Sequence, residues 1–363
     1  MQDLDRPLFL SIVILTLFGL VMVYSAGAAI GVQRFADPLH YLYRQARWLF
    51  LGGLLFALAV RTDYRRWERW VWVFFLVSTA LLVAVLIPGV GVEANGARRW
   101  LRIAGLTMQP AEVAKLAAVA LLAHNLPGRG ECLRDFRNGL LPQLIVVGIP
   151  AFLIYREPDL GGTMVMATVA MVLFYLAGAR LSHLALLVVA VLPVVLWKVV
   201  DIDYRVRRLA AFLDPWADPT DTGWQITQSL MALGSGGLAG HGLSSGVQKL
   251  YFLPEPHTDF IFSVVGEELG LLGTLGVAAC FLLFAWRGLR VAVRAPTPFG
   301  QFLAAGIVVL ITLQALLNMM VCTSLVPTKG LPLPFVSYGG TSLVLNLVAA
   351  GVLLNISRWV TGK

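Results

Sequence analysis

Long apolar segments separated by short polar loops make up most of this 363-residue chain. A helix needs about 20 apolar residues to cross the hydrocarbon core of a bilayer, and the shorter segments reach this length when flanking residues extend them. The pattern predicts ten membrane-spanning helices, at residues 8–29, 46–61, 70–88, 111–124, 140–156, 160–178, 183–200, 261–286, 300–322 and 341–357. We therefore expect an all-α polytopic membrane protein in which residues 1–363 form a single integral membrane domain.

The longest polar loop, residues 201–260, separates the seventh and eighth predicted helices. Proline and aspartate at residues 214–219 are typical of turns, and residues 223–233 have the spacing of an amphipathic helix at the membrane interface. The glycine-rich segment 234–246 matches neither a P-loop nor a dinucleotide-binding fingerprint. Two interpretations of this segment remain open: a flexible loop, or a cradle of backbone amides for an anion.

The composition excludes a soluble protein. Hydrophobic residues make up 58% of the chain and charged residues 13%, whereas a soluble domain has about 25% charged residues. The first apolar segment is as long as a full span and has no Ala-x-Ala cleavage site, so we expect a membrane anchor instead of a cleaved signal peptide. The three cysteines have neither the spacing of a metal site nor that of a disulfide framework.

The net charge of +8 indicates an anionic partner. Ten spans place both termini on one side of the membrane, and the short loops on that side are rich in arginine, which favours the cytoplasm. The opposite side is almost as basic, which an anionic ligand such as a lipid pyrophosphate would explain. Because no basic tract is interleaved with aromatic residues on a soluble domain, we expect membrane lipids and no nucleic acid as partners.

The strongest chemical signal is the sequence LPEPHTDFIF, residues 253–262, at the end of the long loop. His257, Thr258 and Asp259 come together where the chain turns back toward apolar sequence, and two glutamates follow at residues 267–268. A carboxylate at a water–lipid boundary is costly to hold, so such residues are typically functional. We expect Asp259 to be catalytic, with His257 and Thr258 beside it as substrate-binding residues.

A second motif, GARRWLR followed by QPAEVAK, leads into the fourth span. Glu112 suits the positive end of a helix dipole, and Lys115 lies three residues later on the same face, so the two can pair. The pair is either a structural clip or the wall of a polar cavity, and we favour the cavity because intramembrane charges usually face water or substrate. We therefore expect Glu112 and Lys115 to bind substrate. The preceding loop alone would be explained by snorkelling side chains at the interface. With the pair beside it, we expect four more substrate-binding residues: Arg98, Arg99, Trp100 and Arg102.

Residues 327–342, PTKGLPLPFVSYGGTS, do not form a continuous helix, because prolines and glycines interrupt them. Irregular backbone at membrane depth is tolerated only where protein buries it or where it lines a cavity. Ser337 and Tyr338 add more polarity than an ordinary turn requires, so we expect both to bind substrate. The charged turn REPDLGG, residues 156–162, is open to two interpretations, a solvated hairpin or a functional element.

Together these motifs resemble one family. LPEPHTDFIF with GEELG, GARRW with QPAEVAKLA, REPDLGG, and PTKGLPLPFVSYGGTS are similar, in content and in order, to the SEDS family of peptidoglycan glycosyltransferases (shape, elongation, division and sporulation proteins). The resemblance extends through nearly the whole chain and is closer to the division branch than to the elongation branch. Pro256 and Ala111 replace an alanine and a serine of the family pattern, and neither departure removes a charged group.

The resemblance implies a ten-span fold with both termini in the cytoplasm and the large extracytoplasmic loop, residues 201–260, carrying the catalytic motif. It implies polymerisation of lipid II with release of undecaprenyl pyrophosphate, in septal synthesis at the bacterial cytoplasmic membrane. Asp259 matches the essential carboxylate of the family. The expected partners are lipid II, membrane lipids, a class B penicillin-binding protein that acts as transpeptidase, and other divisome membrane proteins.

A sugar hydroxyl is a poor nucleophile near neutral pH, so we expect Asp259 to act as a general base, which typically contributes about 10² to 10⁴-fold in rate. A single working carboxylate fits an inverting transfer. Four residues are candidates for neutralising the pyrophosphate: Arg98, Arg99, Arg102 and Lys115. A divalent cation, Mg²⁺ or Mn²⁺, would add to this charge, and Asp259 could be its ligand instead of the base.

Three alternatives to a division polymerase stay open. A lipid II flippase fits broken spans and intramembrane charges, but the chain has no clear inverted repeat and its polar groups gather on one face. An elongation-type polymerase of the same family is the second alternative. A non-catalytic scaffold would not require Asp259, Glu112 or Lys115.

Overall fold

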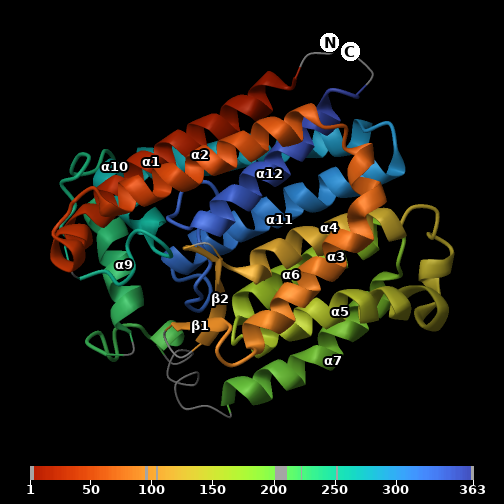
Figure 1. The fold of residues 1–363 in the computed structure, drawn as a ribbon. Coiled ribbons are helices and arrows are strands. Elements are labelled where there is room, and N and C mark those ends of the chain that lie inside the picture. The colour runs from red at the N-terminus through yellow and green to blue at the C-terminus, as the bar shows by residue number, and fades with distance from the viewer. Residues whose placement is uncertain are drawn as a thin grey trace.

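The computed structural model describes residues 4–94, 97–103, 105–200, 211–221, 223–250 and 252–360 (Figure 1). Each of the ten predicted apolar segments coincides with a helix: α1 (Arg6–Phe35), α2 (His40–Arg61), α3 (Arg65–Leu86), α4 (Pro110–Asn125), α5 (Leu141–Arg156), α6 (Leu160–Leu176), α7 (Leu181–Val200), α10 (Ile261–Arg294), α11 (Pro298–Cys322) and α12 (Gly340–Ser357). Parts of two predicted features, residues 201–210, 222 and 251 of the long loop and residue 96 of the GARRW motif, lie outside the described residues.

Within the described part of the chain, six helices are long and apolar enough to cross a membrane by length and composition. They are α1, α3, α5 extended by the π-turn Phe136–Leu140, α10, α11 and α12. The two chain ends lie together at one end of the helical bundle (Figure 1). The protein is therefore an α-helical membrane protein with several long apolar helices, as the sequence predicts.

Several helix starts are set by local sequence. Asp5 caps α1 by accepting a hydrogen bond from Leu8 N at 3.0 Å, and Thr297 caps α11 by accepting one from Gly300 N at 3.1 Å. In both helices a proline occupies the first turn, where its missing N–H would have no helical partner. Pro110 begins α4 in the same way. Such starts are readable from a few neighbouring residues.

Helix α12 forms the centre of the bundle (Figure 1). Its apolar window is 83% buried inside the protein, and it packs against α2, α4, α10 and α11. A Cβ added at Gly351 would lie 2.9 Å from the Cβ of Ala59, and one added at Gly52 would lie 2.8 Å from Leu347 Cδ1. Small residues thus let α2 and α12 approach closely, which is how helices pack where burial of apolar surface gives no driving force.

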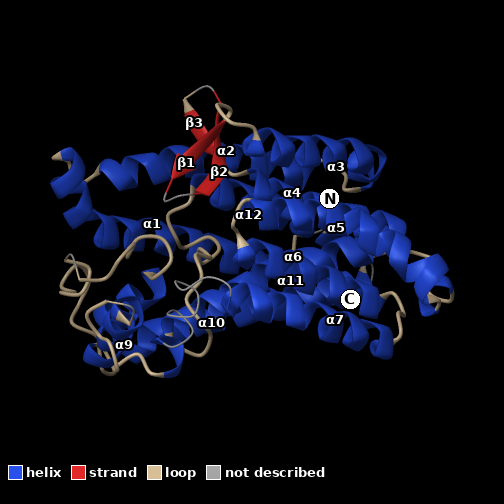
Figure 2. Ribbon diagram, turned by 90° about the horizontal axis from the view of Figure 1, so that it is seen from below, coloured by secondary structure: helices blue, strands red, loops and turns tan. Residues whose placement is uncertain are grey.

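A small antiparallel sheet, absent from the all-α prediction, lies between α3 and α4. Strands β1 (Gly91–Ala94), β2 (Ala97–Ile103) and β3 (Leu106–Met108) pair in the order β1-β2-β3 and stand outside the helices (Figure 2). Strands of three to seven residues contain too few alternations to be recognised beside long apolar runs. The arginine-rich motif is therefore on a strand, where neighbouring side chains point to opposite faces.

Helix α10 is broken at Gly270, where φ is 64° and ψ is −158°. The sequence predicts an unbroken span here. The break leaves a short half, residues 261–269, which begins directly after the LPEPHTDF motif. A break of this kind frees backbone N–H and C=O groups, and within a membrane only protein can satisfy them.

The glycine-rich segment 236–242 supplies those partners. His241 N donates to Glu267 O at 3.1 Å, and Leu271 N donates to Gly237 O at 2.9 Å. Of the two interpretations left open for this segment, a flexible loop and an anion cradle, neither describes these contacts. The segment holds the two halves of the broken helix.

Helix α9 (Trp224–Ser235) occupies the segment predicted as an amphipathic helix, residues 223–233. It packs against α10, and its buried side chains include Ile226 and Ala232. In Figure 1 it runs crosswise to the long helices, at the end of the bundle away from the two termini. This orientation is the one expected of a helix at a membrane interface.

We predict that Gly270→Ala lowers the thermal unfolding midpoint of the purified protein in detergent, whereas Gly276→Ala, on the same helix, does not. A Cβ added at Gly270 would lie 2.5 Å from Gly240 N, and the positive φ disfavours alanine there; we expect a cost of about 1–3 kcal/mol. Nothing lies within 4 Å of a Cβ added at Gly276, where alanine stabilises a helix by about 0.5–1 kcal/mol. Equal midpoints for the two variants would contradict this account of the break.

Candidate functional site

The irregular segment 327–339 holds the chain that leads into α10. Tyr338 N donates a hydrogen bond to His257 O at 2.8 Å, and Ser337 Oγ donates to Thr258 O at 2.6 Å. Four of the predicted site residues are therefore brought together, although 79 positions separate Ser337 from Thr258. Because both acceptors are main-chain carbonyls, these contacts fix the backbone and leave the side chains of the LPEPHTDF motif to other partners.

Asp259 stands two residues before the start of α10 and is half-buried. Its carboxylate faces Gly330, where an added Cβ would lie 3.1 Å from Oδ2. Its main-chain oxygen accepts hydrogen bonds from Asn318 Nδ2 at 2.8 Å and from Cys322 Sγ at 3.6 Å. The positive end of the α10 dipole favours an anion at this position. A carboxylate on a half-buried residue that is anchored through its main chain is suited to accept a proton or to bind a cation.

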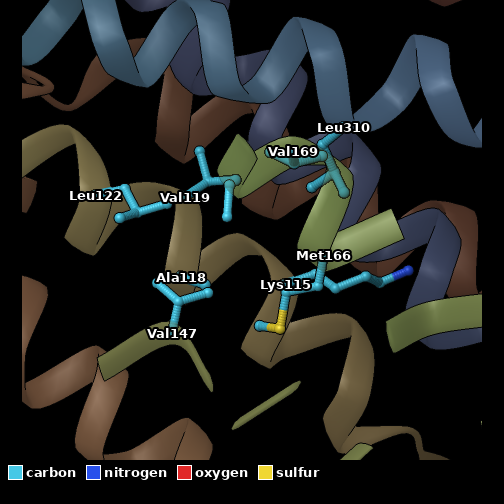
Figure 3. Close-up of a pocket in the computed structure, with 9 residues that line it drawn as sticks. Lys115, Ala118, Val119, Leu122, Val147, Met166, Val169 and Leu310 are labelled. Carbon is cyan, nitrogen blue, oxygen red and sulfur yellow. The ribbon is translucent and has the colours of Figure 1, made fainter. Parts of the chain in front are cut away.

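The predicted Glu112–Lys115 pair is formed and buried. Lys115 Nζ donates to Glu112 Oε1 at 2.7 Å and to Gln314 Oε1 of α11 at 3.1 Å. Lys115 is one of the residues that line a cavity of about 10 Å³, and its Nζ points away from the other lining side chains (Figure 3). The other lining residues are apolar, and the volume holds no more than about one water. This cavity therefore does not accept a substrate, and in this structure the pair joins α4 to α11.

Sequence reasoning missed two amides of α11, Gln314 and Asn318, each with 1% of its surface exposed. Gln314 Nε2 donates to Pro332 O at 3.1 Å, and Asn318 Nδ2 donates to Leu331 O at 2.7 Å. They attach α11 to the segment 327–339. The sequence did contain a signal for these two residues. Two amides four residues apart in an apolar span lie on one helix face and need hydrogen-bond partners there.

Arg99 reaches the turn between α5 and α6. Its Nε donates to Glu157 O at 2.9 Å and its Nη2 donates to Pro158 O at 2.7 Å. The predicted arginine cluster is thereby linked to the predicted REPDLGG turn. The guanidinium contacts main-chain carbonyls of this turn, so it fixes the turn beside the sheet.

The other residues of the arginine motif stay on the sheet. Arg98 pairs with Glu93 of β1 at 3.2 Å, and both side chains are exposed, so the pair adds little stability. Trp100 is half-buried and Arg102 is exposed, opposite Thr107 of β3. The structure places these three side chains on the sheet between α3 and α4.

Glu157 is fully buried, and among the described residues neither of its carboxylate oxygens has a hydrogen-bond partner. Burial raises the pKa of Glu157 to about 8; Asp159 adds to the rise and Arg99 opposes it. A solvated hairpin, one of the two interpretations of this turn, does not fit a buried carboxyl. At neutral pH the Glu157 side chain is mostly protonated.

Lys329, in the segment between α11 and α12, lies near the same turn. Burial lowers the pKa of its ammonium, and the Asp159 carboxylate opposes that shift. Asp159 also caps α6 by accepting a hydrogen bond from Gly162 N at 2.8 Å. Lys329 directly precedes Gly330, and Gly330 faces the Asp259 carboxylate. A cationic residue is therefore adjacent in sequence to the glycine that borders Asp259.

His257 is buried between two tyrosines. Its ring centroid lies 4.3 Å from that of Tyr41 of α2 and 5.4 Å from that of Tyr338. Burial lowers the pKa of His257 to about 4, and Arg34 contributes to the shift. The imidazole is therefore neutral at pH 7 and supports the motif by aromatic packing. Sequence reasoning did not single out Tyr41.

The glutamates that follow the motif have structural partners. Glu268 forms a buried ion pair with Lys249 and accepts a hydrogen bond from Ser25 Oγ of α1 at 2.6 Å. Glu267 Oε1 accepts from Val247 N at 2.6 Å. These contacts tie the long loop to α1 and to the short half of α10.

Comparison with known proteins gives matches over nearly the whole chain. Residues 6–361 match the FtsW/RodA/SpoVE family, described as cell cycle proteins. Over 358 residues the chain is 46% identical to the "Probable peptidoglycan glycosyltransferase FtsW" of Geobacter metallireducens, a match that covers 99% of this chain and 96% of that protein. The similarity therefore includes every motif discussed above.

Two solved structures share the fold. A chain from a structure described as "Structural coordination of polymerization and crosslinking by a peptidoglycan synthase complex" is 29% identical, with a TM-score of 0.81 and 98% of both chains covered. The rod shape determining protein RodA of Thermus thermophilus is 28% identical, with a TM-score of 0.72 and 99% of both chains covered. The arrangement in Figure 1 is thus shared along nearly its full length.

We predict that Glu157→Gln becomes more stable relative to the wild-type protein as the pH rises. The folded protein keeps a proton on Glu157 that the unfolded chain releases above the ordinary pKa of 4.5, so wild-type stability falls between pH 4.5 and about pH 8 and then levels off. Glutamine stays neutral throughout. The measurement is the thermal unfolding midpoint of both proteins in detergent from about pH 5 to about pH 9.

The matched control is Glu131→Gln, because Glu131 is an exposed carboxylate in the loop before α5. Its midpoint should differ from that of the wild type by the same amount at every pH. If the difference for Glu157→Gln were equally independent of pH, the buried protonated carboxyl would be ruled out.

Proposed function

The chain belongs to the FtsW/RodA/SpoVE family, and we propose that it is a peptidoglycan glycosyltransferase of the FtsW type, which polymerises lipid II in septal cell-wall synthesis. The full-length identity of 46% to a protein that carries this enzyme's name supports the activity. The product that leaves at each transfer is undecaprenyl pyrophosphate.

The observation that carries the proposal is the setting of Asp259. Its main chain is held by Asn318, the residue is half-buried with its carboxylate facing Gly330, and Lys329 directly precedes Gly330. Polymerisation needs a base for a sugar hydroxyl and positive charge for a departing pyrophosphate. Both kinds of group are available within two neighbouring segments of this chain.

We assign the reaction to the extracytoplasmic end of the bundle. Ten spanning helices would leave both termini in the cytoplasm, in line with their common end in Figure 1. Helix α9 and the sheet lie toward the other end, where the loops that carry the candidate residues emerge. In this orientation the described part of the long loop, residues 211–221, 223–250 and 252–260, would lie on the outer side of the bacterial cytoplasmic membrane.

In the proposed step, the 4-hydroxyl oxygen of one disaccharide attacks the anomeric carbon of another. The hydroxyl proton passes to the Asp259 carboxylate, and the bond between the anomeric carbon and the pyrophosphate oxygen breaks, with its electron pair leaving on the pyrophosphate. Attack from the side opposite the leaving group inverts an α-linked donor to a β-linked product, and one carboxylate is sufficient for this.

Positive charge for the pyrophosphate would come from two layers of the site. Lys329 lies beside the Asp159 turn, and the exposed Arg98 and Arg102 lie on the sheet. Preorganised cations at the position of developing charge typically give the largest single contribution to such a transfer. Lys115 is already paired with a carboxylate, so we assign it an indirect role.

A divalent cation would fit this site only as a companion of the substrate. Among the described residues no group of three or more metal-ligating side chains occurs. Mg²⁺ is commonly bound by one or two carboxylates together with substrate phosphates, and Asp259 can be the protein's share of such a set. Bound there, Mg²⁺ or Mn²⁺ would neutralise pyrophosphate charge.

The proposed protein partner is a class B penicillin-binding protein, which would crosslink the new strand as transpeptidase. Support comes from the similar chain that belongs to a peptidoglycan synthase complex of polymerization and crosslinking. Other divisome membrane proteins would bring the pair to the septum. Lipid II and the surrounding membrane lipids complete the set of partners.

A lipid II flippase is the second candidate, and the broken helix α10 is the observation that favours it, because transporters use discontinuous helices near their substrate sites. Asp259, however, lies in the loop directly before the short half of α10, and its carboxylate can serve there as the base for glycosyl transfer. The two activities are separable in one preparation.

We predict that Asp259→Ala abolishes glycan polymerisation, with a loss of at least about 10²-fold. The assay uses labelled lipid II and the protein purified with its cognate penicillin-binding partner, whose transpeptidase is blocked. The matched control is Asp214→Ala, which removes an exposed turn carboxylate from the same long loop and should retain wild-type activity. Addition of EDTA, followed by Mg²⁺ or Mn²⁺, measures the need for a cation in the same assay.

Equal polymer from wild type and Asp259→Ala would move the chemistry to another residue. If neither made polymer and lipid II crossed the bilayer of reconstituted liposomes, the flippase would replace the polymerase.

A further inference from the structure

The inference concerns the inner side of the candidate site, where helix α11 presents its only strongly polar buried side chains among the described residues, Gln314 and Asn318. They lie one turn apart on one helix face. Burying an amide without hydrogen-bond partners costs about 2–7 kcal/mol. A spanning helix therefore tolerates these two side chains only if both have partners.

Asn318 joins the two irregular segments of the site. Its Nδ2 donates one hydrogen bond to Asp259 O at 2.8 Å and another to Leu331 O at 2.7 Å. Rotating the amide would place Oδ1 against two carbonyl oxygens, so the chemistry fixes its orientation. One amino group therefore sets the distance between the backbone of Asp259 and the segment whose Gly330 faces the Asp259 carboxylate.

Gln314 extends this connection to α4. Its Oε1 accepts a hydrogen bond from Lys115 Nζ at 3.1 Å, and its Nε2 donates to Pro332 O at 3.1 Å. Lys115 in turn is paired with Glu112. An unbroken series of polar contacts thus runs from the buried ion pair to residue 332, beside the carbonyl that Asn318 holds.

We propose that Gln314 and Asn318 are positioning residues for glycosyl transfer: Asn318 places Asp259 against the 327–339 segment, and Gln314 ties that segment to the Glu112–Lys115 pair. The inference rests on the proposed function. Asn318 donates to the main-chain oxygen of Asp259 and Gln314 donates to that of Pro332, so we assign both a role that acts through the main chain. A displacement of about 1 Å in a reacting group can lower a rate by about 10²-fold. The buried ion pair thereby influences the reaction without touching substrate.

The test compares Asn318→Asp with Asn355→Asp. Asn355 is also a buried amide, with 3% of its surface exposed, and its Nδ2 also donates to a main-chain carbonyl, Val60 O, at 2.8 Å. It lies at the end of α12 next to the termini and belongs to no part of the candidate site. Both substitutions place a carboxylate oxygen against a carbonyl oxygen, so both should lower the unfolding midpoint.

Polymerisation of lipid II is the first measurement. Asn318→Asp should lower kcat by about 10²-fold and leave the KM for lipid II unchanged, which is the pattern of an interaction needed in the transition state. Asn355→Asp should retain the wild-type kcat. If the two variants lost kcat equally, Asn318 would be an ordinary structural amide and the inference would be wrong.

Hydrogen–deuterium exchange is the second measurement, and it does not depend on activity. In Asn318→Asp, the amides of residues 252–260 and 327–339 should exchange faster than in the wild type, while Asn355→Asp should leave both segments protected. If the wild-type protein made no polymer, the proposed function would fail but this comparison would still decide the positioning. Unchanged exchange in both segments would refute it.

A milder variant keeps the test valid if Asn318→Asp does not fold. Gln314→Glu retains an acceptor for Lys115 and loses the donor to Pro332 O, so the 327–339 segment should loosen while α4 and α11 stay joined. We expect a reduced kcat with unchanged KM, together with faster exchange confined to residues 327–339. Wild-type values in both measurements would contradict the role of Gln314.

Discussion

Backbone N–H and C=O groups at membrane depth must find their partners inside the protein, and the irregular parts of this structure depend on that constraint. Helix α10 breaks at Gly270, which leaves backbone N–H and C=O groups without helical partners. The 236–242 segment forms hydrogen bonds with these groups. The 327–339 segment is not helical, and Asn318 satisfies the Leu331 carbonyl within it. Asp259 can lie outside a helix because neighbouring side chains donate hydrogen bonds to the main-chain carbonyls around it.

Buried charges in this fold follow the same logic. Glu112 with Lys115 and Glu268 with Lys249 form pairs in which both partners are buried. A buried pair gives little net stability, but removal of one partner leaves an uncompensated charge and costs several kcal/mol. Such pairs therefore specify which elements lie side by side. Glu157 solves the problem differently, by holding a proton.

The conspicuous motifs divide into chemistry and support once their contacts are known. In the LPEPHTDF motif, His257 packs between tyrosines and Thr258 offers its carbonyl to Ser337. Glu267 and Glu268 tie the long loop to α10. Asp259 is the residue of this group to which we assign a role in the proposed reaction. Most residues of this long motif therefore have a structural role, which is to hold one carboxylate in place.

The helices were predictable from the sequence, because the length and the apolar content of a segment are local properties that must match the hydrocarbon thickness of a bilayer. The sequence also determined the Glu112–Lys115 pair, three residues apart on one helix, and singled out Asp259. It could not reveal the sheet of β1 to β3, whose strands are too short for a pattern, or the break at Gly270, which the 236–242 segment makes possible.

The tertiary structure alone decided the contacts between distant segments. Asn318 lies 59 residues from Asp259, and Gln314 lies 199 residues from Lys115. Periodicity along the chain carries no information about such partners, because they are selected by the packing of one helix against another. The sequence therefore predicted Asp259 as the reacting group, and the fold decided which residues hold its backbone.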